Sequence, residues 1–241
     1  MIGGFIITGN DPKRVVIRGL GRSLESAGFQ DLIPDPLLRL FGATGSQIAQ
    51  NDDWEDTQST DLRTTGLAPK HPLESAILAT LNPGAYTALV SGKNGATGIG
   101  LVEIYDANQP SNSKLTNIST RGVVKTGDNV LIGGFILGGS SIIPTKVVVR
   151  ALGPSLQQGG LAALSDPSLT LFNSDGQALA SNDNWQDNAN QAQQLQTLAI
   201  APPHPAESAI LATLPPGNYT AIVSGKSGGT GIGLIEVYNV Q

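Results

Sequence analysis

Residues 204–214 read HPAESAILATL, and residues 71–81 read HPLESAILATL. Ten of the eleven positions are identical, although the two segments start 133 residues apart. Two further pairs follow in the same order: KRVVIRGLGRSL (13–24) with TKVVVRALGPSL (145–156), and TGIGLVEIY (97–105) with TGIGLIEVY (230–238). Self-similarity at so long a period indicates a tandem duplication of one structural unit.

The chain of 241 residues is long enough for two modest hydrophobic cores. We therefore predict a first repeat at 1–108, a linker at 109–114 and a second repeat at 115–241. No apolar run approaches the roughly 20 residues needed to span a bilayer, and the N-terminal apolar stretch lacks the basic leader and cleavage site of a signal peptide. The sequence thus predicts no membrane span and no signal peptide in this chain.

Short apolar and β-branched runs between clusters of Gly, Pro, Asn and Asp predict strands throughout each repeat. NSDG (173–176) and GATG (42–45) fit hairpin turns, and NANQAQQLQTL (188–198) is the best helix candidate, with Asp187 as its N-cap. We predict an all-β protein of two tandem antiparallel β-sandwich, jelly-roll-like domains. The strands expected in the second repeat are Val130–Leu137, Lys146–Leu152, Ser168–Phe172, Ala178–Ser181, Ser208–Leu214, Tyr219–Ser224 and Gly233–Val240.

The segments DPSLTLFNSDGQALASNDNW (166–185) and LPPGNYTAIVSGKSGGTGIGLIEVY (214–238) resemble the pre-peptidase C-terminal domain of secreted bacterial proteins. The likeness covers about half of each repeat, while the IGGF and VVVRALGPSL segments resemble tandem repeats of large secreted bacterial proteins. The resemblance implies a jelly-roll fold, secretion, and an accessory role in attaching, spacing or assembling.

The composition excludes several classes of function. Without cysteine, the chain has no disulfides, no thiolate nucleophile and no Cys-based zinc site. Charged residues make up only 14% of the chain and the net charge is −5, so its surface repels nucleic acid phosphates. Polar character comes instead from Asn, Gln, Ser, Thr and Gly, which favours an extracellular or cell-surface location.

Two acidic loops, NDDWED (51–56) and NDNWQD (182–187), gather side-chain oxygens of the kind that calcium prefers. The spacing does not match an EF-hand, and Asn and Asp also form turns with their own backbone, with Trp54 or Trp185 closing the core. Both interpretations stay open: no cofactor is required, and Ca²⁺ is the candidate ion. The candidate ligands are Asp52, Asp53, Asp56, Asp183, Asn184 and Asp187.

The sequence offers no catalytic constellation. His71 and His204 stand alone in their repeats, and the serine segments lack the glycines of a nucleophile elbow. We therefore predict that the protein is not an enzyme. Charged residues inside apolar strands suggest an ion pair across the sheet of each repeat, Arg18 with Glu103 and Arg150 with Glu236; the alternative is that these side chains lie on a solvated sheet face.

The segment LTNISTRGVV (115–124) has strand character but occurs once for two repeats, so one module lacks a strand. An incomplete sandwich exposes an edge that pairs with another chain. We expect a structural or adhesive subunit that self-associates head to tail into a fibre by strand complementation. The alternative is a module that binds a cell-surface glycan through an exposed aromatic near Trp54 or Trp185. The predicted assembly residues are Ile2, Phe5, Leu115, Ile118, Val123 and Val124.

Overall fold

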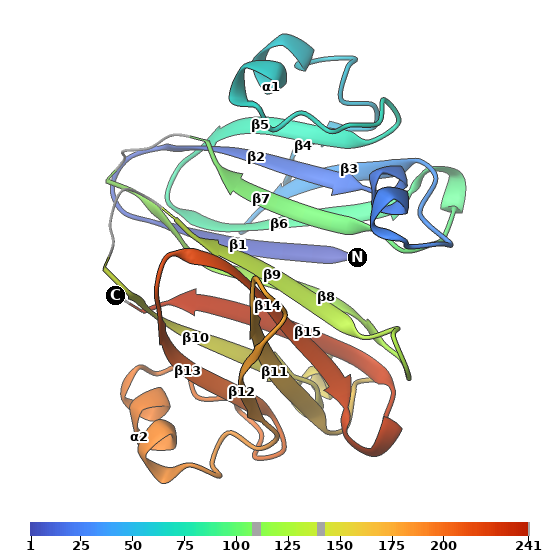
Figure 1. Ribbon diagram of the computed structural model, residues 1–241. Helices are drawn as coiled ribbons and strands as arrows, with labels where there is room; N and C mark the ends of the chain where they lie inside the picture. The colour runs from blue at the N-terminus through green and yellow to red at the C-terminus, as the bar shows by residue number, and fades with distance from the viewer. Residues whose placement is uncertain (108–111, 139–142, 241) are drawn as a thin grey trace. The chain divides into compact units, whose positions relative to one another are not determined.

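The structure is a computed structural model that describes residues 1–107, 112–138 and 143–240 (Figure 1). It divides the chain into two compact units, Met1–Ile118 and Ser119–Gln241. This division falls inside a strand, β8 (Lys114–Val124), whereas the sequence predicted a linker at 109–114, of which 109–111 lie outside the described residues.

The first unit is a sandwich of two antiparallel sheets. One sheet contains β1-β6-β3-β4 in this order, with β8 as the next strand beside β1, and the other has the order β5-β2-β7. The strands are β1 (Ile2–Thr8), β2 (Lys13–Leu20), β3 (Pro36–Gly42), β4 (Gln47–Asn51), β5 (Ser75–Leu81), β6 (Gly84–Gly92) and β7 (Leu101–Asp106), with the helix α1 (Ser59–Thr65) and 3₁₀ turns at η1 (Arg22–Ala27) and η2 (Lys93–Gly95).

The second unit repeats this topology, with the sheets β9-β14-β11-β12 and β13-β10-β15. Its elements are β9 (Leu131–Leu137), β10 (Thr145–Leu152), β11 (Pro167–Asn173), β12 (Ala178–Asn182), β13 (Ser208–Leu214), β14 (Gly217–Gly225) and β15 (Gly231–Asn239), with the helix α2 (Ala189–Thr197) and 3₁₀ turns at η3 (Pro154–Gly159) and η4 (Lys226–Gly228). The predicted fold class, tandem antiparallel β-sandwiches, is confirmed, and every predicted strand of this unit is present within two residues of its expected ends.

The two sheets of each unit face each other through alternate side chains of their strands. The glycines of the IGGF segments allow this close approach. A Cβ atom at Gly3 would lie 3.0 Å from Val102 Cγ1, and one at Gly133 would lie 2.9 Å from Ile235 Cδ1. The core of the first unit consists of Phe5, Ile7, Val15, Ile17, Leu38, Leu40, Ile77, Leu81, Ala88, Val90 and Val102. Each large side chain among them contributes about 1.5–3 kcal/mol on burial.

A helical segment covers the outer face of the sheet that contains β5 or β13 (Figure 1). In the second unit, Trp185 and Leu195 pack there against Val148. The predicted helix is present, but its N-cap is Asn188 and not Asp187: the Asn188 Oδ1 accepts a hydrogen bond from the Gln191 backbone N–H at 3.1 Å. Asn188 adopts the extended conformation that places its side chain over the first helical turn, as N-caps require.

Candidate assembly site

The first part of β8 completes the first unit. β8 is the sheet neighbour of β1, and the Thr116 hydroxyl donates a hydrogen bond to the Ile6 carbonyl oxygen at 3.5 Å. Leu115 and Ile118 pack against the core that contains Phe5. The outer edge of β1 is therefore covered by residues 114–118 of the same chain.

The second part of β8 completes the second unit, where β8 is the neighbour of β15. Val124 is fully buried, and a Cβ atom at Gly233 of β15 would lie 3.2 Å from its Cγ2. Val123 points the other way and is 60% exposed. The first part of the segment 115–124 thus lies in the first unit and the second part in the second unit, whereas the sequence predicted that one module would lack this strand.

Because the two parts of β8 lie in different units, each unit is short of one half-strand among the described residues. The second unit lacks it beside β9, and the first unit lacks it beside β7. In the second unit β9 lies at the end of its sheet, with β14 as its sheet neighbour. Ile132 and Ile136 of β9 are 45% and 64% exposed, whereas the corresponding Ile2 and Ile6 of β1 are partly buried. The predicted assembly residues Ile2 and Phe5 lie on the covered strand, and Phe5 is buried and stacked on Tyr86.

The complementary vacancy lies in the first unit, along β7. Its counterpart β15, which has β8 beside it, begins at Gly231, whereas β7 begins only at Leu101. The residue that precedes β7 and corresponds to Ile232 is Ile99, which is 38% exposed, whereas Ile232 is partly buried. The strand that has β8 beside it, β15, is therefore longer and less exposed at its start than β7.

The other edges carry protective features that natural sheets use against unwanted pairing. Along β13, the Gln191 side chain donates to the Ala209 carbonyl oxygen at 3.0 Å and accepts from the Leu211 N–H at 2.9 Å. Gln58 does the same for Leu78 of β5. β4 and β12 have five residues each, and a register shift interrupts the pairing of each. Among the described strands, β9 and β7 are the edges without such protection.

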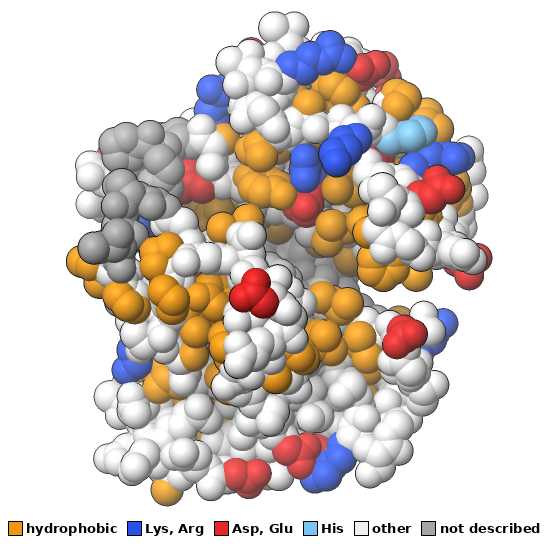
Figure 2. Space-filling model, viewed as in Figure 1, with side chains coloured by type: hydrophobic (Ala, Val, Ile, Leu, Met, Phe, Trp, Pro, Cys, Tyr) orange, Lys and Arg blue, Asp and Glu red, His pale blue; other side chains and the backbone are white. Residues whose placement is uncertain are grey.

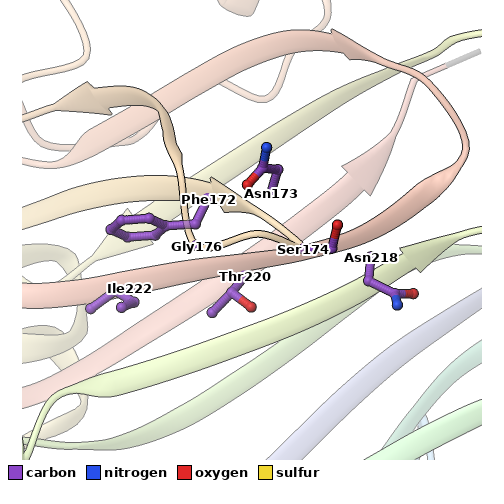
Figure 3. A pocket seen from close by; sticks show the side chains of 7 residues that line it. All are labelled: Phe172, Asn173, Ser174, Gly176, Asn218, Thr220 and Ile222. Atoms are coloured by element: carbon purple, nitrogen blue, oxygen red, sulfur yellow. The ribbon is translucent and has the colours of Figure 1, made fainter.

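The outer face of the β9 sheet carries apolar side chains among polar ones next to its bare edge. Ile132 is paired with Ile222 of β14, and Phe172 of β11 is paired with Thr220. Phe172, Thr220 and Ile222 line a shallow depression of about 490 Å³ (Figure 3). Figure 2 shows one face of the molecule, on which apolar side chains reach the surface at several places. A partner strand on β9 would find Ile222 and Phe172 beside it, among the polar side chains of Asn173, Ser174, Asn218 and Thr220.

The acidic loops surround a lysine. Lys93 Nζ lies 3.5 Å from an Asp35 carboxylate oxygen and also pairs with Asp52. Burial, and next the neighbouring Asp52, raise the pKa of Asp53, and the Asp56 N–H closes a turn on the Asp53 carbonyl oxygen. The Oδ1 atoms of Asp35, Asp52 and Asp53 are buried and have no hydrogen-bond partner among the described residues.

The second unit repeats this arrangement. Lys226 pairs with Asp183 and lies 3.9 Å from Asp166, while the Asn184 side chain donates to Asp187 at 3.4 Å. No group of three or more His, Cys, Asp or Glu side chains within the described ranges is arranged to hold a metal ion. The cation that the structure shows in each cluster is a lysine.

We expect millimolar calcium to leave the melting temperature of the chain unchanged, because Lys93 and Lys226 already pair with carboxylates of these loops. Differential scanning calorimetry with calcium, and with magnesium as the control ion, checks this. A rise of several degrees with calcium alone would show that the loops bind it after all.

Both tryptophans are buried, so neither can itself be the exposed aromatic that the glycan-binding alternative requires. Trp54 and Trp185 are each 5% exposed. Their indole N–H groups donate to the carbonyl oxygens of His71 and His204 at 3.2 and 3.1 Å. The tryptophans close the core under the helical segment, and the histidines form turns.

The charged strand residues form a network on the outer sheet face of each unit. Arg150 Nε donates to Glu236 at 3.0 Å, and the same guanidinium donates to the Ile200 carbonyl oxygen at 2.8 Å and to the Tyr238 hydroxyl at 3.0 Å. The Arg150 and Glu236 side chains are only 12% and 13% exposed. Burial, and next Glu236, raise the pKa of Tyr238 to about 12. The network ties the sheet to the segment after α2.

The first unit has the same network around the predicted pair. Arg18 Nε donates to Glu103 at 2.7 Å, and another nitrogen of the guanidinium donates to the Leu67 carbonyl oxygen at 3.0 Å. The structure therefore pairs each arginine with the glutamate of its own unit, beneath the helical segment and not on a solvated face.

A buried glutamate in each unit was missed by the sequence reasoning, which considered it only beside the histidine. Glu207 is fully buried, and its carboxylate accepts hydrogen bonds from the backbone N–H groups of Gly153, Ser155 and His204 at 3.0, 3.0 and 3.1 Å. The Ser155 hydroxyl adds a fourth bond at 2.6 Å. Glu74 takes the same position in the first unit. The sequence feature that could have pointed to these glutamates is the near-identity of the two HPxESAILATL segments.

No protein-family model matches the chain, and no curated protein sequence matches it either. The resemblance to the pre-peptidase C-terminal domain is therefore not confirmed. None of the helices in the described part of the chain is long and apolar enough to cross a membrane.

Three similar solved structures are distant in sequence and in fold score. A protein from Eubacterium rectale that is described as secreted has 13% identity and a TM-score of 0.24, over 97% of this chain and 68% of that one. The STIV MCP has 11% identity and a TM-score of 0.26, over 98% and 90%. The major capsid protein of bacteriophage PM2 has 7% identity and a TM-score of 0.26, over 100% and 92%. TM-scores this low indicate neither a function nor a partner. A function for this chain therefore has to be inferred from its own strand edges and polar clusters.

Proposed function

We propose that this chain is a non-enzymatic, extracellular structural subunit that self-associates through strand edges. One observation carries the proposal: among the described residues, β9 lacks the neighbour that the equivalent strand β1 has, and it exposes Ile132 and Ile136 instead. Bare edges present unpaired N–H and C=O groups to other chains. The extracellular location is supported by the uncharged polar composition.

A head-to-tail contact suits the two vacancies, because they lie on different strands in the two units, β9 and β7. Contacts between unlike surfaces do not close on themselves and extend into fibres or arrays. The work of such a protein is mechanical: its strands transmit load, and the apolar burial inside each unit resists it.

We expect purified chain to associate reversibly as its concentration rises, and to form extended particles in negatively stained electron micrographs. Light scattering coupled to size-exclusion chromatography measures the change in mass. The double substitution Ile132→Lys and Ile136→Lys should abolish association, since lysines on an edge disfavour strand pairing. Leu179→Lys is the matched control, because Leu179 is 44% exposed on β12, at the opposite end of the same sheet. A monodisperse monomer up to millimolar concentration contradicts self-association.

A further inference from the structure

We propose that the outer edge of β9 binds a second strand of the β8 type, an extended segment with the chemistry of KLTNI (114–118). This inference rests on the proposed function and names the chemistry of a strand that fits the β9 edge. It follows from the duplication, because the chain itself shows what occupies the equivalent edge.

The two edges are equivalent in sequence and in pairing. IGGFI occurs in both β1 and β9, and each strand pairs antiparallel with the hairpin strand of its own unit, β6 or β14. Phe5 stacks on Tyr86 at 5.3 Å between ring centroids, and Phe135 stacks on Tyr219 at the same distance. A strand that fits beside β1 therefore meets a matching backbone and core beside β9.

The segment beside β1 shows which chemistry fits. Thr116 donates a hydrogen bond to a carbonyl oxygen of the edge strand, while Leu115 and Ile118 add apolar contacts to the core. Lys114, at its start, is exposed. Strand addition works in this way: backbone hydrogen bonds supply affinity, and side chains at particular positions supply specificity.

The β9 edge has the features that such a segment would use. Ile132 and Ile136 are exposed on its outer face, and the depression beside Phe172 and Ile222 continues this apolar surface (Figure 3). Unlike β13, the edge has no glutamine side chain bonded to its backbone among the described contacts. The remaining unprotected edge, β7, corresponds to β15 and so matches the later part of β8, residues 119–124.

The test uses a fluorescein-labelled synthetic peptide of residues 112–120, NSKLTNIST, titrated with the full chain and followed by fluorescence anisotropy. We expect saturable binding of one peptide per chain. Ile132→Lys with Ile136→Lys should weaken it at least about tenfold, since both substitutions remove cross-strand apolar contacts. Leu179→Lys should leave it unchanged. A peptide carrying Leu115→Pro and Ile118→Pro, which lacks two backbone donors, should not bind.

Absence of saturable binding at millimolar peptide overturns the inference, as does binding that the β9 substitutions leave intact. These results are separable from a failure of the proposed function. A chain that associates but ignores the peptide keeps its structural role and loses this partner. A chain that binds the peptide at β9 but stays monomeric keeps the partner and loses self-association.

Discussion

Replacing Glu207 with alanine is expected to lower the free energy of unfolding of the second unit by about 4 kcal/mol. The substitution leaves three backbone N–H groups and the Ser155 hydroxyl without their acceptor in a site closed to solvent. Each unsatisfied buried donor destabilises the native state by about 1–3 kcal/mol, partly relieved when the turn η3 relaxes or admits water.

Urea unfolding followed by tryptophan fluorescence measures this loss. The chain has two tryptophans, one in each unit, so a Trp54→Phe background leaves Trp185 as the reporter of the second unit. Asp175→Ala, in an exposed hairpin turn, is the control and should change stability by less than about 0.5 kcal/mol. Equal, small effects of both substitutions would contradict the role assigned to Glu207.

Replacing Arg150 with methionine should lower the stability of the second unit by about 3 kcal/mol. Methionine fills a similar volume, so the effect comes from lost hydrogen bonds and from leaving the Glu236 carboxylate, which is only 13% exposed, without its partner. The Ile200 carbonyl oxygen and the Tyr238 hydroxyl lose a donor as well.

A double substitution separates the pair from the packing. Arg150→Met combined with Glu236→Met removes both charges, and stability should recover to within about 1.5 kcal/mol of the parent chain, since buried ion pairs often tolerate apolar replacement of both partners. Lys125→Met removes an exposed cation of the same unit and serves as control. An unchanged or higher melting temperature for Arg150→Met alone would mean that the pair is not structurally required.

The repeat and most strands could be predicted from sequence because both depend on local patterns. Segments such as SAILATL and GNYTAIVSG show β-rich composition between turn residues, and each has an identical or similar copy in the other repeat that supports the same prediction. The Arg–Glu pairs were predictable for a similar reason: a charge inside an apolar strand needs a partner, and each unit offers one glutamate on a strand with the same pattern.

The remaining features depend on which distant segments meet. Glu207 accepts bonds from residues more than 50 positions earlier, and Lys226 reaches a carboxylate 43 positions away. Periodicity carries no information about such contacts. Strand counting showed that one β-segment is missing, yet it could not show that β8 divides its residues between two units, because a strand was assumed to belong to one domain.

The dual membership of β8 has a practical consequence for dissecting the protein. Cutting the gene at the boundary of the compact units would sever this strand, so that one recombinant half would keep residues 114–118 and the other 119–124. A single repeat therefore has to be excised with the whole of β8 attached. The minimal building block of this architecture is one sandwich together with a strand that also pairs with the following sandwich.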